Sequence, residues 1–146
     1  MSKLSPAARR KARRFTLQGL YQWQLSGGTA AEIEAQFRAD NDLRKTDVDY
    51  FHDLLSGSLR HRDSLDQLLT PLLDRPLQGL DPIERAVLWI GSYELQHRLD
   101  VPLPVVINES VELAKTFGAT DSFRYINGVL DKLGAILRDA EAKARK

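Results

Sequence analysis

The sequence predicts an all-α fold of about seven helices arranged as two packed three-helix bundles. Two observations support this prediction. Apolar residues recur at helical spacing in nearly every segment, and helix start and stop signals follow one another along the whole chain. No segment alternates apolar and polar residues as a half-buried strand would. We therefore expect one helical domain over residues 1–146, with sub-bundles at about 1–74 and 80–139 and a charged tail at 140–146.

The first helix is expected to begin at Ser5-Pro6, because serine caps a helix N-terminus and proline fits the first helical position. The glycines that follow Ser26 end it. Three shorter helices are predicted at residues 30–39, 46–59 and 64–73. Pro76 and Gly79 then interrupt the chain, so the break between the two sub-bundles is placed at residues 75–80.

The next helix has a strong start signal in Asp81-Pro82, with Glu84 at the capping-box position. Its apolar residues cover almost the whole circumference, which predicts a central, buried helix. An extended connector at residues 101–104 precedes a helix that ends near Gly118. The last helix starts near Asp121, and its charged, alanine-rich end from Arg138 onward is expected to fray.

The composition argues against several classes of protein. The chain has no cysteine, which excludes disulfides and cysteine-ligated zinc, and its three histidines lack metal-ligand spacing. No Gly-rich phosphate loop or nucleophile elbow is present, so we expect neither an enzyme nor a bound cofactor or metal. No run of about 18 apolar residues and no signal peptide is found, which predicts a cytoplasmic protein without a membrane partner.

The charge is distributed unevenly along the chain. Residues 1–14 carry six basic residues, beginning with Lys3, and no acid; the first acid is Glu32. Because the whole chain has a net charge of +1, the remainder carries −5. A basic arm on a mildly acidic body indicates a polyanion that is contacted at one place.

The basic run occupies one side of the first helix. At about 100° per residue, the five basic residues within 9–14 cover an arc separate from the apolar arc of Ala8, Ala12, Phe15, Gly19 and Trp23. The alternative is an ordinary solvated face, but such faces mix both signs of charge. The residues are mostly arginine, which binds phosphate in a bidentate manner, and we favour contact with nucleic acid.

Aromatic residues favour RNA over duplex DNA. Tyr21 lies on the same side as Arg10 and Arg14, where it suits an unstacked base, although packing within the bundle is an equal alternative. On the last helix, Arg124 and Tyr125 point away from the apolar stripe and form a second candidate patch. Asp121 sits at the helix start, where its simpler interpretation is an N-cap.

Several motifs together resemble the NusB family of bacterial antitermination factors. They are Asp81 through Leu95 (DPIERAVLWIGSYEL), Asp100-Val101-Pro102, Val106 through Lys115 (VINESVELAK), Phe117-Gly118 with Asp121-Ser122, and Tyr125 through Lys132 (YINGVLDK). Arg13 through Trp23 fits as well. The resemblance covers nearly the whole chain, and the motifs are specific in combination.

The resemblance implies a non-enzymatic protein that forms a heterodimer with NusE, a small-subunit ribosomal protein. Together they would bind the boxA element of ribosomal RNA leaders within the RNA polymerase antitermination complex. The resemblance implies a set of RNA-binding residues, to which we add the basic residue near the start of the chain. The set is Lys3, Arg9, Arg10, Arg13, Arg14, Tyr21, Asp121, Arg124 and Tyr125. The arm would supply affinity that is largely blind to sequence, and specificity would come from the aromatic patches and the partner.

Two residues are carried over as candidate partner contacts. Glu84 would lie near the NusE interface. Trp89 departs from the family pattern, which has a basic residue at that position in many members. An exposed tryptophan there would indicate a changed partner surface or a homodimer. The alternative function is a helical protein–protein adaptor whose basic arm binds an acidic partner.

Overall fold

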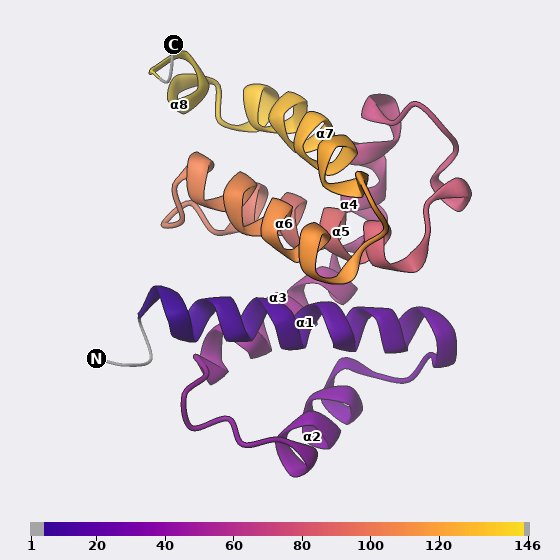
Figure 1. Ribbon diagram of the computed structural model, residues 1–146, viewed down its shortest axis with the longest axis vertical. Coiled ribbons are helices and arrows are strands. Elements are labelled where there is room, and N and C mark those ends of the chain that lie inside the picture. The colour runs from indigo at the N-terminus through magenta and orange to yellow at the C-terminus, as the bar shows by residue number, and fades with distance from the viewer. Residues whose placement is uncertain (1–4, 145–146) are drawn as a thin grey trace. The chain divides into compact units, whose positions relative to one another are not determined.

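The computed structural model describes residues 5–144, and every regular element in that range is a helix (Figure 1). The α-helices are α1 (Pro6–Ser26), α2 (Ala30–Asp40), α3 (Val48–Arg60), α4 (Arg62–Leu69), α5 (Pro82–His97), α6 (Leu103–Phe117), α7 (Ser122–Leu137) and α8 (Asp139–Ala144). Two 3-10 helices, η2 (Thr70–Leu72) and η3 (Leu77–Gly79), lie between α4 and α5. The all-α prediction is confirmed, with eight α-helices in the described range instead of about seven.

The chain divides into two compact units, and the division falls between Arg60 and His61. The sequence placed it at residues 75–80, where Pro76 and Gly79 interrupt the chain. The structure corrects this boundary: α4 packs against α5 and α7, so it belongs to the second unit. The segment between α4 and α5 is therefore a connection within one unit.

The first unit is a three-helix bundle of α1, α2 and α3. Helix α1 packs along α3, and α2 contacts both. A cluster of three phenylalanine rings joins the helices, with each pair of centroids 6.0 Å apart; the rings belong to Phe15, Phe37 and Phe51. The helices approach closely at Gly19, where a Cβ atom would lie 3.1 Å from the Leu55 side chain. A glycine permits this crossing because it adds no side-chain volume.

The second unit is built around α5, as the sequence predicted for a helix that is apolar all round. Every residue from Ala86 to Leu95 is buried, and α5 contacts α4, α6 and α7. At Gly91, a Cβ atom would lie 2.7 Å from the Leu130 side chain of α7, so any larger residue at this crossing would force Leu130 to move. The Asp81 side chain accepts a hydrogen bond from the Glu84 N–H at 2.8 Å and caps the helix start.

A buried arginine closes the C-terminal side of the second unit. Arg138 is 6% exposed, and its guanidinium donates hydrogen bonds to four backbone carbonyls of the α5 end and the following turn. The acceptors are the carbonyl oxygens of Glu94 (3.0 Å), Leu95 (3.1 Å), Arg98 (3.0 Å) and Val101 (2.6 Å). The expectation that the chain frays from Arg138 is wrong, because this residue is anchored and α8 follows it.

The described helices were also compared with the length and hydropathy that a bilayer requires. Among residues 5–144, none is both long and apolar enough to cross a membrane.

Candidate nucleic-acid interface

The basic run of the first helix starts directly behind a well-formed cap. Ser5 accepts a hydrogen bond from the Ala8 N–H at 3.0 Å, and Pro6 occupies the first turn. That turn contains no acidic residue. Cations near a helix N-terminus oppose the helix dipole, so this arrangement does not stabilise α1 itself. The dipole of α1 therefore gives no reason for this run of positive charge.

Two of the arginines turn inward toward α3. The Arg9 guanidinium lies 4.2 Å from the centroid of the Tyr50 ring, and that of Arg13 lies 5.4 Å from it. Arg9 Nε also lies 3.7 Å from the buried carboxylate of Asp47. Arg13 is only 3% exposed, so its prediction as a surface RNA contact is wrong. The helical projection missed this because one tyrosine ring accommodates two guanidinium groups on the α3 side.

The other side of α1 carries the exposed strip, which we define as Arg10, Arg14 and Tyr21. Arg10 and Arg14 are exposed, and Tyr21 is 38% exposed. Residues spaced by four and seven positions share one helix face, so the two cations and the aromatic ring form a line along α1. Lys3 lies outside the described residues. The strip combines phosphate-binding charge with a ring on which a base can stack.

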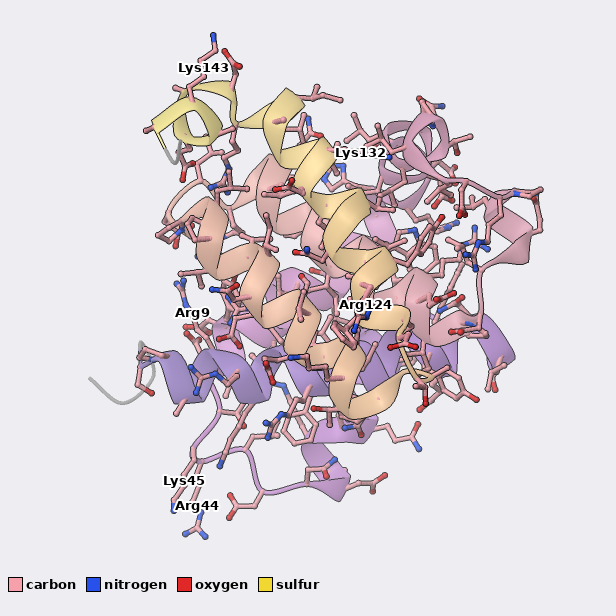
Figure 2. All side chains as sticks on the ribbon, turned by 45° about the horizontal axis from the view of Figure 1, so that its top comes forward. Arg9, Arg44, Lys45, Arg124, Lys132 and Lys143 are labelled. Atoms are coloured by element: carbon pink, nitrogen blue, oxygen red, sulfur yellow. The ribbon has the colours of Figure 1, made fainter. Side chains whose placement is uncertain are left out.

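The start of α7 differs from the simple cap expected there. Asp121 has φ 68°, in the left-handed region, and its side chain makes no capping hydrogen bond. Its carboxylate lies 3.4 Å from the Arg124 guanidinium, and both side chains are exposed. Figure 2 labels Arg124 near the start of α7. The cap interpretation of Asp121 is therefore wrong, and its charge partly offsets that of Arg124.

Tyr125 is half-buried and packs against the connection between α4 and α5. Its hydroxyl accepts a hydrogen bond from the Asp74 N–H at 3.3 Å, and the Arg75 guanidinium lies 4.3 Å from the ring centroid. Arg75 also pairs with the Asp74 carboxylate at 2.9 Å. Burial raises the pKa of the Tyr125 hydroxyl above its ordinary value. Sequence analysis missed Arg75, because no local pattern shows that it meets a ring fifty residues away.

The two candidate partner residues are largely enclosed. Trp89 is 1% exposed, and its indole N–H donates to Asp66 at 2.7 Å. Asp66 also accepts from Arg85 at 3.1 Å. Trp89 therefore offers no partner surface, and the homodimer inferred from an exposed tryptophan loses its basis. Glu84 is 8% exposed; burial, and secondarily the charge of Asp81, raises the pKa of its carboxyl group.

The comparisons with known proteins agree with this geometry. The model of the NusB family matches residues 10–135. The chain belongs to the NusB family. It is 59% identical to the transcription antitermination protein NusB of Alcanivorax borkumensis, over 97% of this chain and 95% of that protein. The corresponding protein of Idiomarina loihiensis is 56% identical, over 88% and 93%.

Solved structures support the same fold. A NusB structure from T. maritima has a TM-score of 0.74 at 26% identity, covering 86% of this chain and 89% of that one. A crystal structure of NusB and NusE in complex with double-stranded RNA has a TM-score of 0.75 at 26% identity, covering 96% and 99%. The resemblance predicted from the motifs is thus confirmed. As a NusB-family chain, the protein is a transcription antitermination factor and not an enzyme, as predicted.

Proposed function

We propose that this protein forms a heterodimer with NusE that binds boxA RNA in ribosomal RNA leader transcripts and supports processive transcription in the cytoplasm. The observation that carries the proposal is the exposed strip of α1, in which two arginines lie in line with a tyrosine on one face of the helix. A family neighbour was crystallised with NusE and double-stranded RNA, which supports both classes of partner.

The arginines of the α1 strip have a different role in this proposal from Tyr21 and the exposed residues at the start of α7. Arg10 and Arg14 bind phosphates, which gives affinity without much sequence preference. Tyr21, Arg124 and Tyr125 contribute base stacking and hydrogen bonds, which give specificity. Asp121 limits the positive charge beside Arg124 and so keeps binding of unrelated RNA weak.

Binding to boxA RNA should be compared with binding to a scrambled RNA of the same composition and to a double-stranded RNA, each with and without NusE. We expect tighter binding of boxA than of the scrambled RNA, and a further gain when NusE is present. Equal affinity for boxA and scrambled RNA would contradict the proposal. Tight binding of only the duplex would replace boxA with a structured RNA as the ligand.

A protein adaptor is the competing function, and ribonuclease separates it from the proposed one. We expect NusE to be recovered by this protein with or without ribonuclease, and RNA polymerase subunits to be recovered only when RNA is intact. Polymerase recovery that survives ribonuclease and is unaffected by boxA RNA would favour the adaptor, with the basic arm on an acidic partner.

Glu84 is the proposed contact near NusE. Glu84→Gln keeps the shape of the side chain and removes its charge, so we expect weaker NusE binding in calorimetric titration. Asp63→Asn, which removes an exposed carboxylate from α4, is the matched control. Equal NusE affinity of both variants and the unmodified protein would remove Glu84 from the interface.

A further inference from the structure

The connection between α4 and α5 contributes a residue to the Tyr125 cluster that the motifs did not indicate. Arg75 is exposed, yet its guanidinium lies over the Tyr125 ring, 4.3 Å from the ring centroid and well within cation–π range. The hydrogen bond from the Asp74 N–H to the Tyr125 hydroxyl fixes the connection beside the ring. One face of a candidate base-stacking ring is therefore covered by a planar cation.

Little free energy holds Arg75 in this place. Its guanidinium pairs with the adjacent Asp74 carboxylate at 2.9 Å, and both side chains are largely exposed, at 42% and 66%. Exposed ion pairs contribute little to stability because water screens them. The Tyr125 ring is held more firmly, since it is half-buried and bonded to backbone. The guanidinium can therefore move away from the ring while the ring stays in place.

The charges around Arg75 and Tyr125 indicate which kind of group could enter between the guanidinium and the ring. The Asp74 carboxylate is bonded to Arg75, which lowers the pKa of that carboxyl and keeps it charged. The charge of Glu84 also acts on Arg75. Phosphate would be repelled by these neighbouring acids, whereas the face of an uncharged base would not. The cluster thus suits a base better than the nucleic-acid backbone.

We propose that one unstacked RNA base inserts between the Arg75 guanidinium and the Tyr125 ring. The base stacks on the tyrosine, and the arginine, displaced outward by one layer, stacks on the other face of the base. Arg75 is thereby a further RNA-binding residue of this protein, contributed by the connection between α4 and α5. This inference rests on the proposed RNA-binding function and adds a specific contact to it.

The test uses the full chain with NusE and a boxA RNA that carries 2-aminopurine at successive positions. In the unmodified protein, binding should quench fluorescence strongly at one position, because stacking quenches this base. Arg75→Ala and Tyr125→Ala should each remove that quenching and weaken binding about five- to a hundredfold. The double variant should be little weaker than either single one, because both residues hold the same base.

Conservative variants separate stacking from charge. Arg75→Lys keeps the charge but lacks the plane, so it should behave like Arg75→Ala. Tyr125→Phe keeps the ring and should bind nearly as well as the unmodified protein. Arg38→Ala, which removes an exposed arginine from α2, is the matched control and should leave the quenching unchanged. If Tyr125→Ala does not fold by circular dichroism, the Arg75 variants, changed in an exposed connection, carry the test.

The outcomes distinguish this inference from the proposed function. If the unmodified protein does not prefer boxA to scrambled RNA, the function itself fails. If it does prefer boxA but Arg75→Ala binds and quenches as before, the function stands and the inserted base is refuted. Tighter binding by Arg75→Ala would also refute it, since Arg75 would then only compete with RNA for the ring.

Discussion

Arginines in two regions of the molecule have opposite environments. At the end of α7, Arg138 is buried and donates hydrogen bonds to four backbone carbonyls and to the Glu141 carboxylate. On the outer side of α1, Arg10 and Arg14 are exposed. The comparison shows that arginine content alone does not locate a binding surface, because an arginine surrounded by carbonyls stabilises the fold and only an exposed one is available to a partner.

The largest effect is expected at the buried end of this comparison. Arg138→Ala removes four hydrogen bonds to carbonyls; Glu94 and Arg98 still accept from backbone N–H groups, whereas Leu95 and Val101 lose their donor, and each buried unsatisfied group costs about 1–3 kcal/mol. We expect the free energy of unfolding to fall by more than about 3 kcal/mol in urea titration. Arg124→Ala, at an exposed arginine of the same helix, should change it by less than about 0.5 kcal/mol. Equal losses for the two variants would contradict the structural role of Arg138.

Tryptophans extend the comparison from charged to aromatic side chains. Trp89→Phe removes the indole N–H that Asp66 accepts and leaves a small cavity, so we expect a loss of about 2 kcal/mol. Trp23→Phe removes a hydrogen bond to the Gly28 carbonyl at an exposed site and should cost less than about 1 kcal/mol. Unfolding monitored by circular dichroism gives both values. If the Trp89→Phe protein were as stable as the unmodified protein but bound NusE more weakly, Trp89 would have to be a partner contact.

Neighbouring arginines on α1 give the sharpest form of the comparison. Arg13 is buried beside the Tyr50 ring, so Arg13→Ala should cost about 1 kcal/mol of stability. Arg14 is exposed, so Arg14→Ala should leave stability within about 0.5 kcal/mol and weaken RNA binding. Thermal unfolding measures the stability of the two variants, and RNA titration measures their affinity, so together they test whether the two effects are separated in this way. The same loss of RNA affinity at unchanged stability in both would mean that Arg13 also reaches RNA.

The smallest expected effect concerns acid stability at the end of the second unit. The Leu103 N–H and then Arg138 bind the Glu141 carboxylate and lower its pKa in the folded state. A carboxyl whose pKa is lowered by folding stabilises the protein above its ordinary pKa and loses that contribution as the pH falls through the lowered value. Glu141→Gln should therefore be less stable at neutral pH and lose less on acidification. Identical pH profiles would show that the contact adds no stability.

Local signals predicted the helices well, because caps and periodicity are encoded in adjacent residues. The cap at Ser5, the end at Gly27 and the buried circumference of α5 all follow from such signals. The boundary between the two units did not follow from local signals. Pro76 and Gly79 mark a loop, but they do not show whether that loop lies between units or within one. Only the packing of α4 against α5 shows that this loop is internal.

The site was predicted less completely than the fold, for a physical reason. A helical projection shows which residues share a side, but not which of them meets a neighbouring helix. Arg13 was therefore placed outside although Tyr50 covers it, and Arg75 was missed although it covers Tyr125. Contacts between residues far apart in the chain depend on packing, which composition and spacing do not record.

The salt dependence of boxA binding tests the central claim most directly, because it counts phosphate contacts. Arg10→Ala with Arg14→Ala should reduce the slope of log affinity against log salt concentration by about 1.4, since each lost single-strand phosphate contact lowers it by about 0.7. The control variant Arg38→Ala with Lys143→Ala also removes two positive charges, one from α2 and one from α8, and should leave the slope unchanged. An unchanged slope in the α1 variant, or an equal fall in both, would contradict an RNA-binding strip on α1.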